Sequence, residues 1–437
     1  MAFSLDKIKC KTAEEKPCSV LFDVQVPADL VNREYEKTLA LFQKTAQLPG
    51  FRSGKAPLEM IRQNFASRAR TEAVEELLKE GIPIILQDKK IMAVETPQVQ
   101  KLQLNEDESL SFTLLVERSP EFKTKNYKGI KLERKGKEIS ADDIEKDLES
   151  LRQRNATLQF SEASNVEKNH FAVIDYEGFI DGKSDTDLKA EHQLIDMNTP
   201  QTVAGFAEGI MGMSRNETKE VTVQFPEDYA YKKLAKQTVT FKITLQDIKE
   251  KKLPAADDEL AKDFGYETLT ALKEHIEKSL KSSLEKSVES DLEQQIVDYL
   301  DQENPIPVPS GLIDRQADVM VNQFMRSQYG KEMERESKEV VEKRRVELIE
   351  KLRPEAEKMV RTSYLLEDIA KQENLYASDE DWAAELEKAK QSDPEKAKDI
   401  EKYFKEKRGS ILNRLAESKI FKYLKDNAKI TETKTEK

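Results

Sequence analysis

The uneven distribution of glycine constrains the fold of this chain more than any other feature of its sequence. Five of the 14 glycines lie between residues 178 and 212, whereas residues 251–437 contain only four. Glycine suits turns and is disfavoured inside helices. The distribution therefore predicts a turn-rich middle part followed by a long helical tail.

A long apolar stripe marks the first helix of this tail. Its members are Leu269, Leu272, Ile276, Leu280, Leu284, Val288, Leu292, Ile296 and Leu300. Most steps are four residues, so the stripe drifts by about 40° per step around a helix of 3.6 residues per turn and can face more than one neighbour. Prolines at 305, 307 and 309 end this helix. Further helices are expected over 311–329, 335–373, 378–391 and 396–426.

The parts before the tail carry strand patterns. Phe22, Val24 and Val26 alternate with polar residues, which indicates a half-buried strand. Apolar residues at helical spacing follow this strand, from Val31 to Phe42. The next segment, LPGFRSGKAP (48–57), contains two prolines and two glycines, which predict a loop. A second helix is expected from Pro57, with strands near 91–103 and 110–117. In the middle part, apolar residues alternate strictly at Val239, Phe241, Ile243 and Leu245, and again at Val221, Val223 and Phe225, which predicts antiparallel β structure.

Composition excludes several classes of protein. Charged residues make up 36% of the chain, hydrophobic residues 38%, and the net charge is −12. No run of 18 apolar residues could span a membrane, and the N-terminus has no apolar core long enough for a signal peptide, so the chain is expected in the cytoplasm. The two cysteines and three scattered histidines do not have metal-ligand spacing. No cofactor, metal or histidine-based catalysis is expected.

Residues 41–70 form a cationic stretch in this acidic chain. Six basic residues and one acid give this stretch a charge of +5, whereas residues 251–437 sum to −7. Arg52 and Lys55 lie in the Pro/Gly loop beside Phe51, an arrangement that suits an anionic partner such as RNA or an acidic protein patch. A solvated helix face is the alternative for Arg62, Arg68 and Arg70. The glycines at 50 and 54 are one residue too close for a phosphate-binding P-loop, and Ala56 follows the lysine, so ATP binding is not expected.

The same loop carries a resemblance to a known family. Its motif Gly-Phe-Arg-x-Gly-Lys-x-Pro, at Gly50, Phe51, Arg52, Gly54, Lys55 and Pro57, resembles the ribosome-docking signature of bacterial trigger factors. The resemblance covers essentially the whole chain. It implies that these residues bind a ribosomal protein and rRNA beside the exit of the nascent chain.

The resemblance also implies a multidomain α+β architecture. Its expected parts are an α+β docking domain (1–118), a linker strand and helix (119–156), an FKBP-like antiparallel β domain (157–250), an elongated all-α chaperone domain (251–430) and a disordered tail (431–437).

The FKBP-like part is expected to catalyse rotation about X–Pro bonds in an apolar pocket. By position in the family pattern, the resemblance assigns this pocket to Tyr176, Val203, Phe206, Tyr229, Tyr231 and Phe241. Departures from the pattern follow the hairpin turn, where the family's aromatic residue and Gly-Gly bulge are missing. Asp185 or Asp187 is a candidate for the pocket acid, and the two remain open. The alternative is a folded barrel whose aromatic residues serve only as core.

The tail is expected to bind unfolded polypeptides. Met320, Phe324, Met325 and Tyr329 form an apolar patch around Val321, and methionine adapts to varied partners. Helix–helix core is the alternative for this patch. The resemblance implies that the tail holds nascent chains without ATP.

Together these features predict a ribosome-associated chaperone with prolyl isomerase activity. Its expected partners are the ribosome and unfolded nascent chains, with no DNA and no membrane, and family members can also form homodimers away from the ribosome. Two alternatives stay open, a free FKBP-like isomerase and a holdase whose isomerase domain is inactive.

Overall fold

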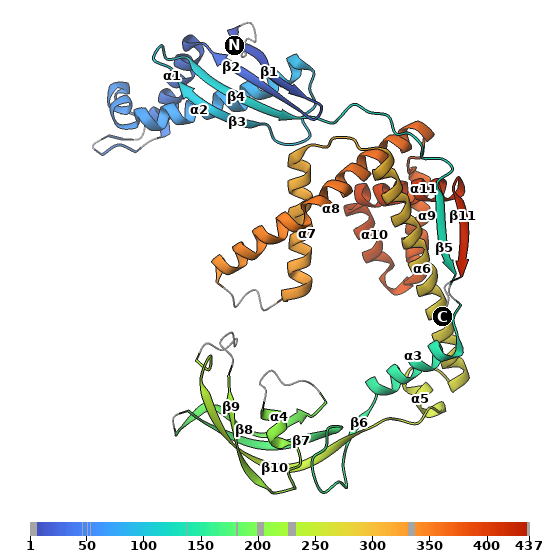
Figure 1. The fold of residues 1–437 in the computed structure, drawn as a ribbon. Coiled ribbons are helices and arrows are strands. Elements are labelled where there is room, and N and C mark those ends of the chain that lie inside the picture. The colour runs from blue at the N-terminus through green and yellow to red at the C-terminus, as the bar shows by residue number, and fades with distance from the viewer. Residues whose placement is uncertain are drawn as a thin grey trace. The chain divides into compact units, whose positions relative to one another are not determined.

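The computed structural model describes residues 7–45, 47–49, 51–52, 54–136, 138–180, 182–198, 205–225, 233–330 and 337–434 (Figure 1). The chain divides into two compact units, Met1–Lys135 with Glu289–Thr433, and Gly136–Val288 with Lys434–Lys437.

The N-terminal part is a sheet covered by two helices (Figure 1). The antiparallel strands lie in the order β1-β2-β4-β3. Their bounds are β1 (Lys9–Lys16), β2 (Ser19–Val26), β3 (Gln98–Leu104) and β4 (Leu110–Glu117), and the helices are α1 (Ala28–Thr45) and α2 (Leu58–Lys89). The predicted alternation is confirmed, because Phe22, Val24 and Val26 are buried against α1 and α2.

The middle part contains the predicted antiparallel sheet. Its strands are β6 (Thr157–Phe160), β7 (His170–Ile180), β8 (Lys183–Asp196), β9 (Thr218–Gln224) and β10 (Thr238–Lys252), and the short helix α4 (Phe206–Ile210) packs beside them. The strand order is β6-β10-β7-β8, and β9 also pairs with β10. One face of β10 supplies much of the core through its predicted alternating residues, since Val239, Ile243 and Leu245 are fully buried.

The helical tail differs from expectation at its boundaries. Its helices are α5 (Asp258–Asp263), α6 (Leu269–Glu303), α7 (Ser310–Tyr329), α8 (Lys338–Glu373), α9 (Asp379–Ser392), α10 (Ala397–Glu406) and α11 (Arg408–Asp426). The prediction of one helix over 396–426 is wrong, because the chain leaves helical geometry at Lys407. The break lets Phe404 and Ile411 bury their side chains in the same cluster with Leu386.

The expected linker, residues 119–156, is shared between the two units. Helix α3 (Ala141–Arg154) packs through Leu148 on α5 and the start of α6, in a cluster with Leu260 and Leu272. Residues 119–135 belong instead with the later helices. The predicted boundaries at 118, 156 and 250 therefore do not coincide with these packing units.

The expectation of a disordered C-terminus from residue 431 is wrong for residues 431–434. These residues belong to β11 (Lys429–Lys434), which pairs with β5 (Lys131–Gly136). Two backbone hydrogen bonds lie at the start of the paired segments, from Gly129 N to Asn427 O (2.8 Å) and from Lys429 N to Ile130 O (2.7 Å). Local composition could not reveal this strand, because its partner lies some 300 residues earlier. Residues 435–437 lie outside the described part of the chain.

A charged cluster fixes the segment before β5 to the helical tail. The Glu373 carboxylate accepts hydrogen bonds from the hydroxyls of Tyr127 and Tyr423, each at 2.7 Å, and pairs with the Lys128 amine at 2.8 Å. The Lys128 amine also lies 5.6 Å from the centroid of each tyrosine ring. Hydrogen bonds from Lys128, Tyr423 and Tyr127 lower the pKa of the Glu373 carboxyl from 4.5 to about 2. The hydrogen bond to Glu373 in turn raises the pKa of the Lys128 amine.

We expect Glu373→Gln to destabilise the helical tail at neutral pH. Because the folded pKa of Glu373 is lowered, its contribution is present above about pH 4.5 and is lost as the pH falls toward about 2. The stability difference between wild type and variant should shrink over that range. The fluorescence of Trp382, the single tryptophan, can follow unfolding. Glu367→Gln is the matched control, since the ion pair of Glu367 with Lys371 is exposed and is the only one that Glu367 forms among the described residues. A difference that does not depend on pH would contradict this role of Glu373.

Candidate functional site

The Pro/Gly loop between α1 and α2 is anchored at both ends. Leu48 and Ala56 are buried in a cluster with Leu39 and Ile61. The side-chain amide of Gln43 donates to the Ala56 carbonyl at 2.8 Å. These contacts fix where the loop leaves and re-enters the domain.

Within the loop, two tight turns present the predicted docking residues. Phe51 N donates to Leu48 O (3.1 Å) and Lys55 N to Arg52 O (2.9 Å). Gly54 has φ +76°, a left-handed conformation that suits glycine. Phe51 is 41% exposed, and the side chains of Arg52 and Lys55 are exposed. Pro57 directly precedes α2, and Gly50 lies outside the described residues.

The basic residues of the neighbouring helix differ from those of the loop. The Arg62 guanidinium pairs with Glu36 at 2.6 Å, Arg68 lies over the Phe42 ring at 5.3 Å, and Arg70 lies over a tyrosine ring. In the described part of the chain, Arg52 and Lys55 form no ion pair. The alternative of a structural, solvated helix face therefore fits the helix arginines, whereas the two loop cations have no such role among the described residues.

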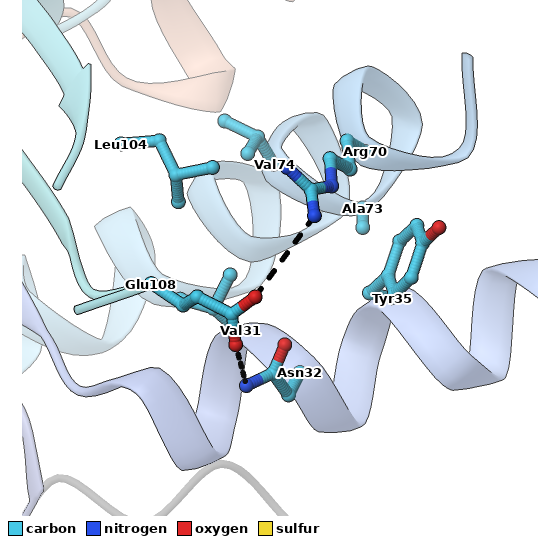
Figure 2. A pocket seen from close by; sticks show the side chains of 8 residues that line it. All are labelled: Val31, Asn32, Tyr35, Arg70, Ala73, Val74, Leu104 and Glu108. Carbon is cyan, nitrogen blue, oxygen red and sulfur yellow. Dashed lines mark hydrogen bonds and ion pairs between the residues drawn. The ribbon is translucent and has the colours of Figure 1, made fainter. Parts of the chain in front are cut away.

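Figure 2 shows what surrounds Arg70. Its guanidinium lies 5.6 Å from the Tyr35 centroid and 3.9 Å from a Glu108 oxygen. The other Glu108 oxygen accepts from the Asn32 amide at 2.8 Å. These residues border a crevice of about 20 Å³ between α1, α2 and the turn before β4, with room for about one water. The crevice is too small for a substrate, and its contacts hold the turn against the helices.

In the middle part, three predicted site residues come together. Tyr176 on β7, Phe206 on α4 and Phe241 on β10 form a triangle of rings, with centroids 5.8, 5.8 and 5.1 Å apart and interplanar angles of 85°, 78° and 84°. Such edge-to-face contacts are favourable. Phe241 is buried, whereas Tyr176 and Phe206 are half-buried, so part of each of their side chains is exposed. Val203, Tyr229 and Tyr231 lie outside the described residues.

Sheet register and two glycines place these rings. Tyr176 pairs with Ile243 and Gly178 with Phe241 across β7 and β10, so the rings of Tyr176 and Phe241 approach on one face. Gly205, with φ +96°, precedes α4, and its N–H donates to the Glu208 carboxylate at 2.7 Å. This cap fixes the start of the helix that carries Phe206.

Each candidate for the pocket acid has a polar contact on the chain. Asp185 accepts a hydrogen bond from the Asp187 N–H at 2.9 Å, so it closes a local turn. Asp187 lies 3.6 Å from the Lys233 amine. The sequence-based expectation overlooked Leu188, which follows these acids and packs against the aromatic core. Its only sequence signal was that it is the single apolar residue in KSDTD-L-K.

Comparison with known proteins decides the family. Residues 8–151 match the model described as bacterial trigger factor protein (TF), residues 268–426 its C-terminus, and residues 162–246 the FKBP-type peptidyl-prolyl cis-trans isomerase model. Trigger factor of Syntrophotalea carbinolica is 30% identical over 413 residues, covering 94% of this chain and 93% of that protein. The chain belongs to the trigger factor family. The trigger factor of Halalkalibacterium halodurans is 32% identical over 369 residues, covering 84% and 86% of the two chains.

One solved structure resembles the whole chain weakly. It is described as "Promiscuous Substrate Recognition in Folding and Assembly Activities of the Trigger Factor Chaperone", and the match covers 96% of this chain and 99% of that one. At 20% identity and a TM-score of 0.47, it adds nothing to the assignment. The family assignment rests on the sequence matches.

In this trigger factor family member, the apolar patch predicted on the tail divides between core and surface. Val321 and Met325 are buried, with exposed fractions of 0% and 4%, whereas Phe324 is 39% exposed. Met320 is half-buried beside α8, and the Tyr329 ring lies under the Arg344 guanidinium at 4.4 Å. The core alternative therefore fits Met325, and Phe324 is the member of the patch with the most open surface.

Exposed apolar side chains also occur where sequence reasoning did not place them. They are Val319 on α7 and Val340, Val346 and Met359 on α8, each about half exposed. Their spacing is irregular, so no periodic signal revealed them. The described residues contain no cluster of potential metal ligands and no helix apolar and long enough to cross a bilayer.

Proposed function

We propose that the protein is an ATP-independent, ribosome-associated chaperone that also isomerises X–Pro bonds, and that it acts in the cytoplasm. The observation that carries this proposal is the loop at residues 48–57. Its ends are buried, and its Phe51, Arg52 and Lys55 side chains are exposed. The trigger factor family supports the same assignment.

The loop combines two kinds of attraction for a ribosomal partner. Arg52 and Lys55 can neutralise RNA phosphates or protein carboxylates, and Phe51 can bury an aromatic ring at the centre of the contact. The net charge of −12 opposes approach of the rest of the chain to an anionic surface. Binding is thereby concentrated at the loop, with Gly50, Gly54 and Pro57 shaping its backbone.

We expect the combined change Phe51→Ala, Arg52→Ala and Lys55→Ala to weaken ribosome binding by at least about tenfold, because anchor residues at an interface centre each contribute more than about 1 kcal/mol. Co-sedimentation with ribosomes at several salt concentrations measures this. The matched control is the double change Arg62→Ala and Arg70→Ala, which also removes two positive charges but takes them from the neighbouring helix. Equal binding by wild type and the loop variant would favour a free isomerase.

The aromatic triangle supports the isomerase part of the proposal. Rotation of a peptide bond faces a barrier of about 18–20 kcal/mol because it breaks amide resonance. An apolar site can lower this barrier without a nucleophile, by removing water from the amide and favouring the twisted form. We assign the proline contact to the open surfaces of Tyr176 and Phe206 above Phe241, and we retain Val203, Tyr229 and Tyr231 as further members of the site.

We expect Phe206→Ala to lower kcat/KM on a prolyl tetrapeptide by about tenfold or more. The change removes apolar contact with the substrate in the transition state, and about 1.4 kcal/mol of lost contact corresponds to one factor of ten in rate. Phe160→Ala in the full-length chain is the control, since Phe160 is an exposed aromatic of the same unit, on β6. A wild-type rate equal to the uncatalysed rate would leave a holdase with an inactive isomerase domain.

The helical tail is assigned to unfolded nascent polypeptides. Exposed apolar side chains on α7 and α8, among them Phe324, Val340 and Val346, offer contacts that do not require a defined sequence. Met320 and Tyr329 flank this surface, and Met325 supports it from the core. No nucleotide is required for contacts of this kind.

We expect Phe324→Ser to reduce the suppression of aggregation of a chemically denatured model protein, because the change removes exposed apolar area from the client surface. Light scattering without ATP measures the effect. Met92→Ser is the control, since Met92 is an 86% exposed apolar residue of the N-terminal domain. An equal loss in both variants, or none in either, would argue against a client surface at Phe324.

A further inference from the structure

Helix α7 begins without a cap from its own N-cap residue. That position is occupied by Pro309, whose side chain accepts no hydrogen bond, and the first turn of α7 contains no acidic residue. The first amides of a helix have no partner within the helix, so their partners come from elsewhere. For α7 the partner is a residue of the N-terminal sheet, 194 positions before Gly311 in the chain.

The Glu117 carboxylate, at the end of β4, provides this cap. One of its oxygens accepts a hydrogen bond from the Ser310 hydroxyl at 2.6 Å, and the other accepts from Gly311 N at 2.8 Å. Glu117 is buried, with 9% of its surface exposed. A carboxylate is favourable at this end of a helix, because its hydrogen bonds are charge-assisted and it faces the positive end of the helix dipole.

Gly311 allows the carboxylate to approach the helix. A Cβ atom at position 311 would lie 2.7 Å from a Glu117 oxygen and 3.1 Å from Glu95 Cγ. A residue with a side chain would therefore displace the carboxylate. One turn further along α7, Arg315 pairs with Glu95 at 3.1 Å, but the Arg315 side chain is 65% exposed. Such an exposed pair contributes little to stability, so Glu117 carries most of this contact.

The two sides of the contact have separate apolar cores. The N-terminal sheet buries its apolar face with α1 and α2, whereas α7 buries Ile313 in a cluster with Ala356 of α8, and these two clusters have no member in common. Just after β4 the chain is held to α8, where the hydroxyls of Ser119 and Tyr364 lie 3.3 Å apart. The contact of Glu117 with α7 can therefore open without exposing either core.

Ser310 offers a second way to cap α7. Serine is among the preferred N-cap residues, because its side-chain oxygen accepts a hydrogen bond from the amide two or three positions later. In the structure the Ser310 hydroxyl instead donates to Glu117. When Glu117 withdraws, this hydroxyl can accept from the amide of Leu312 or Ile313. The helix then starts one residue later and is capped from within its own sequence.

We propose that Glu117 and Ser310 form a releasable joint between the N-terminal domain and the helical tail. In the closed state Glu117 caps α7. In the open state Ser310 caps α7, and the N-terminal domain turns about the residues that follow β4 while α7 keeps its fold. Because α7 also carries the exposed Phe324, the joint decides whether this apolar surface moves together with the loop at residues 48–57. This equilibrium is internal to the chain and depends neither on the ribosome nor on the isomerase site.

Distances between two spin labels in the full-length chain test this joint. Met92 in the N-terminal domain and Val319 on α7 are exposed, so cysteines at these two positions accept the labels, after Cys10 and Cys18 are replaced by alanine. Double electron–electron resonance then measures the distance distribution. The chain with an intact Glu117 should give one narrow main distance.

Three variants of the labelled chain define the role of the carboxylate. Glu117→Ala should replace the main distance by a broader, open population. Gly311→Ala should do the same, because its methyl group displaces the carboxylate, but it should have no further effect when combined with Glu117→Ala. Glu106→Ala is the matched control, since it removes an exposed carboxylate from the same domain, and it should leave the distance unchanged. An unchanged distance in Glu117→Ala or in Gly311→Ala would overturn the proposal.

Hydrogen exchange separates a releasable joint from a cap that α7 needs in order to fold. In Glu117→Ala, exchange of the Gly311 amide should become faster by about tenfold or more, because the amide loses a charged acceptor. Amides from Asp314 onward should keep their wild-type rates, because Ser310 takes over as the cap. Faster exchange throughout α7 in this variant would overturn the proposal, since Glu117 would then be required for the fold of the helix.

Ser310→Asp tests the alternative cap directly. Aspartate is also a good N-cap residue, but its carboxylate repels that of Glu117. The variant should therefore show the open distance population while the exchange rates of α7 from Asp314 onward stay at wild-type values. A closed distance population in Ser310→Asp, or faster exchange throughout α7, would contradict the exchange of caps.

Discussion

The need to satisfy backbone polar groups shapes the first unit, because its connecting segment, residues 119–135, is almost without secondary structure before β5. Side chains of the tail provide the missing partners. Asp368 accepts from Thr124 N at 2.7 Å, and the Asn304 amide bonds both to Lys125 N and to its carbonyl. Gln295 does the same for Glu133, on the edge of β5. The Glu373 cluster adds charge to this arrangement, so an early segment of the chain is part of the helical tail.

The candidate sites follow from which groups the fold leaves without a partner inside the chain. The helix arginines are used by Glu36, Phe42 and the Tyr35–Glu108 crevice, whereas the loop cations are not paired among the described residues. In the middle part, ring edges and faces stabilise one another but leave Tyr176 and Phe206 partly open. In both places, a buried frame supports a small exposed set of side chains, which is how a rigid scaffold prepares a binding surface.

Sequence patterns were sufficient to predict a helix or strand where the spacing of apolar residues shows which face is buried. The alternation around Phe22 and Val239 and the leucine stripe of α6 identified their elements, because one face of each must be apolar. The loop at residues 48–57 could also be predicted from the sequence, since its Pro/Gly content and its motif lie in ten consecutive residues. Met325 and Phe324 show the limit of this reasoning. They are neighbours of similar hydrophobicity, yet one is buried against the helix pair and the other is 39% exposed.

The order of an α+β part, an antiparallel β part and a helical tail could be predicted from the residues, as could the cationic loop and the three aromatic rings, because each is encoded by residues close together in the chain or by a family motif. The pairing of β11 with β5, the position of Leu188 beside Gly178 and the internal contacts of the helix arginines could not be predicted in this way. These features depend on contacts between distant segments and on a change of strand register. A shift in register changes which side chains face the core without altering the local composition.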